Sequence, residues 1–315
     1  MRKIILLLAS TGLVVLLASV VALGLVNTRA QAAFPGANGR IAVVSDERLY
    51  TMNPNGTDKT YLPGTEDARD PSWSPDGQKI AFSAFSGGDS EVYIIDLNTE
   101  QVTPLTNNAA VEDRYPTWSP NGQKIAFASD RDGDYDIYKM NAAPQSATNV
   151  PKKLTTNTKD DLEPAWSPNG GKITFARYRD GGNSDIYIMD NSPSTEGATN
   201  ISRTTSSESS PDWSPSGEKI AFANSGNRPG IYVMNKDGSN KNRVAFPRHE
   251  FFYLPPKDPA WSPNGRKIAY SIRLAPDEPA SDSEIFVINK DGSNKNRLTN
   301  NTTDDSAPDW QPIIP

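Results

Sequence analysis

The stretch Pro116-Thr117-Trp118-Ser119-Pro120-Asn121-Gly122-Gln123-Lys124-Ile125-Ala126-Phe127 combines a tryptophan between two prolines, a tight turn and an apolar run. The 315-residue chain has six tryptophans, and all six stand in the frame proline, any residue, tryptophan, any residue, proline. They are Trp73, Trp118, Trp166, Trp213, Trp261 and Trp310, spaced by 45, 48, 47, 48 and 49 residues. A period in this range indicates stacked supersecondary units.

Each unit has the pattern of four short β-strands. Seven residues after each of the first five tryptophans an apolar run begins at isoleucine, namely at Ile80, Ile125, Ile173, Ile220 and Ile268. A turn such as Pro75-Asp76-Gly77 lies between the two, where Pro presets φ and Gly accepts a positive φ. A second β-rich run such as Ile137-Tyr138 follows, then another turn and a short last strand. Residues after 33 show no helical periodicity.

The proline frame indicates where the tryptophan strand lies in each unit. A prolyl residue cannot donate to a sheet ladder, so prolines on both sides of Trp are typical of a sheet edge. In a propeller blade the innermost strand is such an edge and faces the central channel. We therefore expect the tryptophan strand to be innermost and its indole to pack between neighbouring blades, burying on the order of 150–250 Å².

The two ends of the chain complement each other. Trp310 has no isoleucine seven residues later, whereas Ile41-Ala42-Val43 has no tryptophan before it. The missing inner strand of the first unit therefore stands at the C-terminus, and pairing it with the N-terminal unit closes a ring. We predict one all-β domain over residues 34–315, a six-bladed β-propeller of four-stranded blades. The alternative, an open solenoid, would need atypical capping units at both ends.

Residues 1–33 have the pattern of an export segment. Arg2-Lys3 precedes the uncharged apolar run Ile4–Val26, and Ala30-Gln31-Ala32 resembles a cleavage site. The run is also long enough to span a bilayer. A cleaved signal peptide and a retained N-terminal anchor are therefore both open, and contact with a membrane is expected only through residues 4–26. Either alternative places residues 34–315 beyond a membrane, in the periplasm or outside the cell.

Composition excludes several classes of function. The chain has no Cys and one His, His249, which excludes disulfides, thiol nucleophiles, Cys-ligated zinc and sites that need two imidazoles. The formal net charge is −6, and −9 without residues 1–33, so nucleic-acid binding is not expected. We predict no cofactor and no metal. A closed ring needs no partner for its edges, so we expect a monomer.

Acidic residues before the tryptophan strands are the candidate partner-binding site. Before four of the six tryptophans an acid stands five residues upstream, and before the other two an acid stands three residues upstream. The six are Asp70, Asp113, Asp161, Glu208, Asp258 and Asp305. In a closed ring they are expected around one mouth of the channel, where converging carboxylates attract cations and basic peptide segments. The alternative is a structural role in which the acids cap turns by accepting backbone N–H bonds.

The frame D-x-x-P-x-W-S-P-[DN]-G-x-K-I-A-F resembles the repeat of the TolB-like propellers, a WD-repeat-like family. The resemblance covers nearly all of residues 34–315. It implies an exported, non-enzymatic binding module of the cell envelope, with an envelope or extracellular protein or peptide, such as a Pal-like lipoprotein, as its partner. The competing prediction is a hydrolase or lyase acting on an envelope or extracellular polymer. The chain has no G-x-S-x-G motif, but carboxylates alone could serve a glycosidase.

Overall fold

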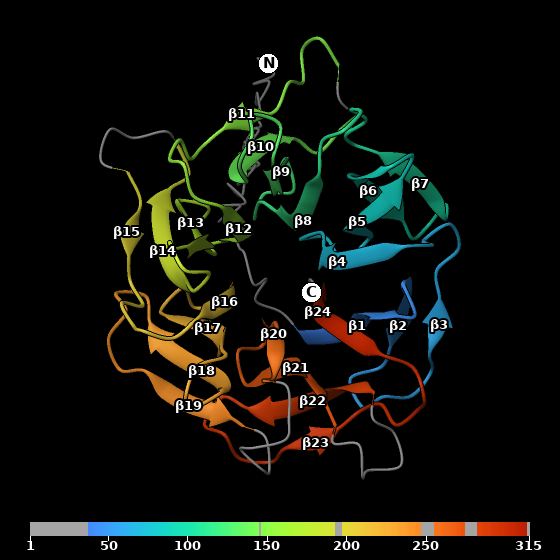
Figure 1. Ribbon diagram of the computed structural model, residues 1–315. Coiled ribbons are helices and arrows are strands. Elements are labelled where there is room, and N and C mark those ends of the chain that lie inside the picture. Colours follow the sequence, from blue (N-terminus) through green and yellow to red (C-terminus); the bar gives the residue numbers. More distant parts are fainter. Residues whose placement is uncertain (1–36, 145, 193–196, 247–254, 275–281, 314–315) are drawn as a thin grey trace, which may run out of the picture.

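The computed structural model describes residues 37–144, 146–192, 197–246, 255–274 and 282–313. These residues form six four-stranded sheets with antiparallel pairing, arranged as blades around a central axis (Figure 1). The predicted all-β, six-bladed propeller is confirmed. In the part of the chain that the structure describes, no helix is long and apolar enough to cross a bilayer. The predicted export segment, residues 1–33, lies outside that part.

Every blade repeats the same strand order from the channel outward. The inner strands of blades 1 to 6 are β24 (Asp305–Ile313), β4 (Ala68–Trp73), β8 (Asp113–Trp118), β12 (Asp161–Trp166), β16 (Glu208–Trp213) and β20 (Lys257–Trp261). The second strands are β1 (Ala37–Ser45), β5 (Lys79–Ser86), β9 (Lys124–Ser129), β13 (Lys172–Tyr178), β17 (Lys219–Asn224) and β21 (Lys267–Arg273). The third strands are β2 (Arg48–Met52), β6 (Asp89–Asp96), β10 (Asp136–Asn141), β14 (Ser184–Asp190), β18 (Gly230–Asn235) and β22 (Ser283–Asn289). The outer strands are β3 (Thr60–Tyr61), β7 (Gln101–Pro104), β11 (Lys152–Lys153), β15 (Thr199–Asn200), β19 (Asn242–Ala245) and β23 (Asn296–Arg297).

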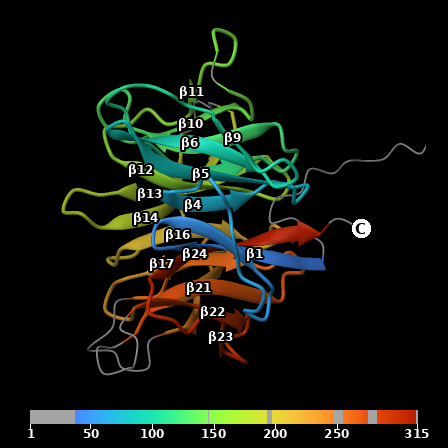
Figure 2. The ribbon, with the colours of Figure 1, turned by 90° about the vertical axis from the view of Figure 1, so that its right-hand side faces the viewer.

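The ring is closed by pairing the two ends of the chain. Strand β24 supplies the inner strand of blade 1 and lies antiparallel to β1, with Trp310 opposite Ile41. Ala37 lies opposite Ile313, so β1 begins at the same end of the ring at which β24 finishes (Figure 2). The prediction of a closed ring, rather than an open solenoid, is therefore confirmed.

The hydrophobic core lies between the blades. The six tryptophans are only 1–5% exposed, and each belongs to a separate apolar cluster. Trp166 of blade 4, for example, packs with Ala126 and Ile137 of blade 3 and with Phe175 of its own blade. All the buried cluster residues fall between Ile41 and Trp310, so a chain that begins at residue 34 keeps every one of these contacts and is expected to fold on its own.

A β-bulge interrupts every inner strand three residues before its tryptophan. In blade 2, Arg69 pairs with Ser83 and Ser72 with Ala81, so two residues on β4 oppose one on β5. The first bulge residue, here Asp70, has a positive φ, and its counterparts in the other blades do too, with φ between 47° and 56°. The second bulge residue is the proline of the frame, which has no N–H to leave unpaired. The bulge turns its first residue toward the channel.

Candidate functional site

A cavity of about 200 Å³ occupies the centre of the ring. Its wall is built from two positions of each inner strand, three residues and one residue before the tryptophan. The upper level, set by the bulges, consists of Asp70, Tyr115, Glu163, Ser210, Asp258 and Ala307. The lower level consists of Ser72, Thr117, Ala165, Asp212, Ala260 and Asp309. The strand repeat therefore converts one sequence frame into two stacked rings of side chains.

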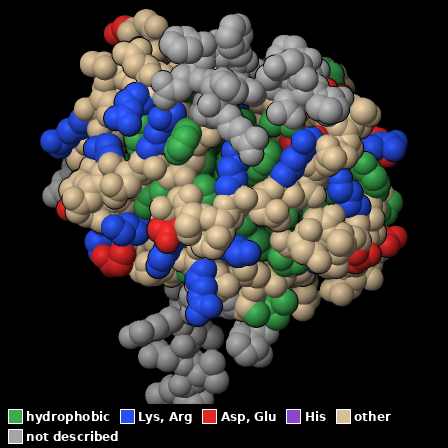
Figure 3. Space-filling view, turned by 90° about the horizontal axis from the view of Figure 1, so that it is seen from below, with side chains coloured by type: hydrophobic (Ala, Val, Ile, Leu, Met, Phe, Trp, Pro, Cys, Tyr) green, Lys and Arg blue, Asp and Glu red, His purple; other side chains and the backbone are tan. Residues whose placement is uncertain are grey.

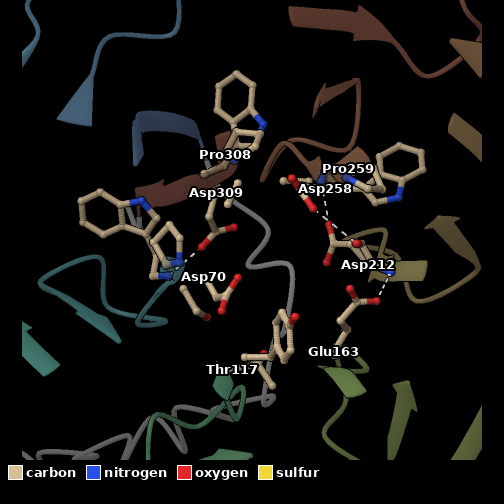
Figure 4. Close-up of a pocket in the computed structure, with 18 of the residues that line it drawn as sticks. Asp70, Thr117, Glu163, Asp212, Asp258, Pro259, Pro308 and Asp309 are labelled. Atoms are coloured by element: carbon tan, nitrogen blue, oxygen red, sulfur yellow. Dashed lines mark hydrogen bonds between the residues drawn. The ribbon is translucent and has the colours of Figure 1, made fainter. Parts of the chain in front are cut away.

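Among the residues that the structure describes, five carboxylates and no Lys or Arg line this cavity (Figure 4). In the upper level Asp70, Glu163 and Asp258 come from blades 2, 4 and 6, so acids alternate with uncharged residues around the ring. In the lower level Asp309 comes from blade 1 and Asp212 from blade 5. The cavity thus concentrates negative charge without a cation of its own, an arrangement that attracts positively charged ligands.

The two lower-level acids are held by the backbone of the next blade. Asp309 Oδ2 accepts a hydrogen bond from the Trp73 amide at 2.7 Å, and Asp212 Oδ2 accepts one from the Trp261 amide at 2.6 Å. These bonds fix one oxygen of each carboxylate. The geometry is therefore preorganised before any ligand enters.

The upper-level acids are positioned in a similar way. Glu163 Oε2 accepts a hydrogen bond from the Ser210 amide of blade 5 at 2.6 Å. Asp70 Oδ2 accepts one from the Ser83 hydroxyl at 2.9 Å, and Ser210 Oγ lies 3.4 Å from Asp258 Oδ1. Glu163, Ser210 and Asp258 thus link adjacent blades across the channel wall, and dashed lines in Figure 4 mark hydrogen bonds among the lining residues.

Burial raises the pKa values of four of these carboxyl groups. The pKa of Asp212 rises to about 8 because the group is desolvated and because Asp309 repels its charge, which outweighs the amide bonds it accepts. Desolvation also raises the pKa of Asp309 to about 7. The pKa of Glu163 rises to about 7 through desolvation, with repulsion from Asp258 and Asp70 adding to it. Desolvation raises the pKa of Asp70 to about 6 despite its Ser83 bond.

The raised pKa values have a chemical consequence. Because of these pKa values, the carboxyl groups are partly protonated near neutral pH. A cation that enters the cavity would favour their ionised forms, so the carboxyl groups would release protons. Strongly shifted acids in a cavity are typical of functional sites. Within the described ranges no three His, Cys, Asp or Glu side chains are grouped so as to hold a metal ion. His249 lies outside the described residues.

The structure separates the six acids predicted from sequence into two groups. Asp70 and Asp258 line the cavity. The other four are Asp113, Asp161, Glu208 and Asp305, which begin their inner strands with fully buried side chains and are not among the lining residues. Of the six acids predicted from sequence, we therefore propose only Asp70 and Asp258 as residues that bind a partner at the channel.

Two of the buried acids are held by arginines of the same blade. Arg131 donates to both oxygens of Asp113, at 2.9 and 3.1 Å, and Arg177 donates to both oxygens of Asp161, at 2.7 and 2.8 Å. Each guanidinium also stacks over two aromatic rings of its blade. Paired, hydrogen-bonded burial of this kind orders the start of the inner strand, because either partner alone would be costly to bury.

The other two buried acids accept hydrogen bonds mainly from uncharged groups. Glu208 Oε1 accepts from Asn224 Nδ2 at 2.9 Å, and Asp305 Oδ2 accepts from Asn301 Nδ2 at 2.8 Å. Lys59 Nζ lies 3.6 Å from Asp305. The donors to Glu208 and Asp305 are side chains, so these contacts order the blade but are not the backbone N–H bonds that the structural alternative predicted.

Three channel acids were missed by the sequence reasoning, namely Glu163, Asp212 and Asp309. Their spacing from tryptophan could have identified them. Each stands one or three residues before a tryptophan, and these positions lie on the side of the inner strand that faces the channel. The position five residues before tryptophan follows the same alternation, but the bulge inserts one extra residue between it and the tryptophan. That shift takes the position out of the channel wall.

The fold and the site together define a six-bladed propeller with an acidic central channel. A family model of the TolB beta propeller domain matches residues 57–163 and 148–255, which together are more than half of the sequence. The chain belongs to this family.

Solved structures confirm the likeness of fold. TolB from Acinetobacter baumannii is 24% identical with a TM-score of 0.74, and the match covers 87% of this chain and 67% of that one. A protein described as TolB from Agrobacterium tumefaciens is 22% identical with a TM-score of 0.64, covering 83% of this chain and 88% of that one. An oligogalacturonate lyase in complex with manganese is 15% identical with a TM-score of 0.54, covering 84% and 74%.

Proposed function

We propose that this protein is an exported, non-enzymatic binding module whose central channel receives a positively charged segment of an envelope or extracellular protein or peptide. The observation that carries the proposal is the set of five channel carboxylates, with no Lys or Arg beside them in the described part of the cavity wall. Four of them have pKa values raised to between about 6 and about 8, so ionising them in the empty protein costs stability. A cationic ligand would offset that cost.

The dimensions of the cavity limit which ligands it can accept. A volume of about 200 Å³ suits a long side chain or a chain terminus, not a folded element. A lysine, an arginine or an N-terminal amine reaching in from a partner that rests on the ring fits both the space and the charge. Membership of the TolB propeller family supports an envelope partner, and a Pal-like lipoprotein is the example we propose. The export pattern of residues 1–33 supports the same location.

Affinity capture from a native envelope extract tests the proposal. The bait is residues 34–315, compared with a variant that carries Asp70→Asn, Glu163→Gln and Asp258→Asn. We expect a specific protein on the unmodified bait and at least about tenfold less of it on the variant, because three charge-assisted contacts are weakened. A lysine-containing peptide, titrated against both forms with tryptophan fluorescence as readout, measures the same difference with a defined probe.

A matched control separates the channel from the overall charge. The control variant carries Asp46→Asn, Glu66→Gln and Asp180→Asn, three exposed acids that do not line the cavity. It removes the same number of carboxyl groups and should bind like the unmodified protein. Equal loss in both variants, or equal capture by all three baits, would contradict a channel site.

A second candidate function is a hydrolase or lyase acting on an envelope or extracellular polymer. The observation that favours it is the pKa of about 7 at Glu163 and Asp309, which suits a general acid near neutral pH. The fold likeness to an oligogalacturonate lyase points the same way. Polysaccharide substrates, incubated with and without manganese, test it. Turnover that disappears in Glu163→Gln would support an enzyme over a binding module.

A further inference from the structure

We propose that the end of the ring at which β1 begins is a docking surface for an anionic lipid bilayer. This inference concerns a different surface from the channel and does not depend on the channel's ligand. Three features support the proposal: the basic hairpins of blades 5 and 6, the place where the chain enters the ring, and the separation of charge between the two ends of the molecule.

Two neighbouring blades carry the same basic hairpin. Asn235–Arg243 in blade 5 and Asn289–Arg297 in blade 6 are identical over nine residues and connect the third strand to the outer strand. The turn of the blade 6 hairpin lies against the outer strand of blade 5, because a side chain added at Gly292 would meet the carbonyl oxygen of Val244 in β19 at 3.0 Å. The repeat therefore places two copies of one charged segment side by side.

The turns between the inner and second strands of blades 5 and 6, Ser214–Lys219 and Ser262–Lys267, lie at the same end. The Lys290 amide donates to the Arg266 carbonyl at 3.0 Å, which joins the two turns of blade 6. Exposed cations from these four turns form what we call the basic surface: Lys236, Lys241, Arg266, Lys267, Lys290 and Lys295. Figure 3 views the ring from its rim, perpendicular to the channel axis, and shows more Lys and Arg than Asp and Glu side chains on that side.

Few acids lie among these cations. The four turns together contain nine Lys and Arg but only three acids, Glu218, Asp237 and Asp291. Glu218 is paired with Lys236 at 2.9 Å. Asp237 and Asp291 accept hydrogen bonds from the serines two residues later in their own turns. The basic surface is therefore net positive in a protein whose overall charge is negative.

The opposite end of the ring carries the excess negative charge. The turn Asp130–Asp136 between β9 and β10 contains four acids and one arginine, and Glu66–Asp70 before and within β4 contains three acids and one arginine. Charge is thus separated along the channel axis. An anionic surface would repel the molecule as a whole and attract it in one orientation only, with the basic surface inward.

The chain enters the ring beside the basic surface. Asn38, the second residue of β1, accepts a hydrogen bond at 3.3 Å from the amide of Asn264, two residues before Arg266. Ten residues, 27–36, separate β1 from the apolar run Ile4–Val26, and they span at most about 36 Å. An anchor retained in a bilayer would therefore hold the basic surface close to the lipid headgroups. The same surface remains on a cleaved chain.

Vesicle co-flotation of residues 34–315 tests the proposal without the apolar run. Vesicles of phosphatidylcholine alone are compared with vesicles of equal parts phosphatidylcholine and phosphatidylglycerol, at about 0.1 M and about 1 M salt, where the Debye length falls from about 10 to about 3 Å. We expect binding to the anionic vesicles only, and only at the lower salt concentration.

Two variants with the same change of net charge identify the surface. The test variant carries Lys241→Gln, Arg266→Gln, Lys267→Gln and Lys290→Gln. The control carries Arg48→Gln, Arg69→Gln, Arg203→Gln and Lys257→Gln, exposed residues at the acidic end. The test variant should lose at least about tenfold in vesicle partitioning, since each cation near an anionic surface contributes. The control should bind like the unmodified chain, and circular dichroism checks that both are folded.

Three outcomes would overturn the proposal. The first is no partitioning of the unmodified chain onto anionic vesicles. The second is equal loss in the test and control variants, which would mean that net charge rather than this surface acts. The third is tighter binding to soluble polyglutamate than to vesicles, which would assign the surface to a soluble polyanion instead of a bilayer.

Discussion

Replacing Asp212 with asparagine should change how the stability of the protein depends on pH. Asp212 is half-buried in the channel wall, and desolvation raises its pKa from an ordinary 3.8 to about 8 in the folded protein. Asparagine keeps the oxygen that accepts the Trp261 amide bond and removes the charge. The substitution therefore isolates the cost of a desolvated carboxylate.

The sign and size of the effect follow from the shift. Because the folded pKa is higher than the unfolded one, the protonated group stabilises the fold at low pH, and this contribution is lost as pH rises from about 4 to about 8. The full shift corresponds to about 6 kcal/mol, of which about 2 kcal/mol is lost by pH 5 and about 4 kcal/mol between pH 5 and pH 9. The variant should not show the second loss.

Guanidinium denaturation at pH 5, 7 and 9, followed by tryptophan fluorescence, measures this difference. The free energy of unfolding of Asp212→Asn, relative to the unmodified protein, should increase by several kcal/mol from pH 5 to pH 9. The control is Asp237→Asn in an exposed turn, where hydrogen bonds from Ser239 lower the pKa of the aspartate, so no titration is expected in that range. Parallel pH profiles for the unmodified protein and Asp212→Asn would refute the reasoning.

Three further predictions concern the scaffold. Arg177→Met should cost about 3–5 kcal/mol in chemical denaturation because it leaves Asp161 buried without its partner, and adding Asp161→Asn should recover much of the loss; additive losses would contradict this. Ala307→Gly should raise the free energy of unfolding by up to about 1 kcal/mol because φ is 47° there, whereas Ala260→Gly, at a channel alanine without a positive φ, should lower it by about 0.5–1 kcal/mol; equal effects would argue against strain. A chain that ends before Asp305 should lose its cooperative thermal transition, since blade 1 lacks its inner strand, and an excess of a peptide of residues 305–315 should restore it.

The sequence was sufficient to predict the architecture because its strongest signals are local and repeated. The proline frame around each tryptophan marks the inner strand, and the unmatched Trp310 and Ile41 indicate the closure of the ring. The first signal follows because proline has no N–H to donate to a neighbouring strand. The second follows from counting the strands of each unit, so neither requires knowledge of the folded structure.

The channel lining could not be predicted in the same way. A one-residue bulge between Asp113 and Trp118 decides which acids face the axis, and the pattern of apolar residues does not reveal it. The partner of Asp113, Arg131, is on the hairpin that follows the next strand, a pairing that only the folded blade brings together. The sequence therefore locates acidic residues on the inner strands, but it does not show which of them face the channel.

The bulge of the inner strands also bears on how such a channel changes over evolution. The same backbone conformation carries Asp70, Tyr115, Glu163, Ser210, Asp258 and Ala307. Strand pairing on either side fixes the backbone there, and the side chains add contacts between blades, such as the bond that Glu163 accepts from the Ser210 amide. The side chains at these six sites can thus differ on one scaffold, as they do among the six blades of this chain. A new ligand preference would require only a few substitutions around this circle, which offers one physical reason why a single propeller fold serves so many roles.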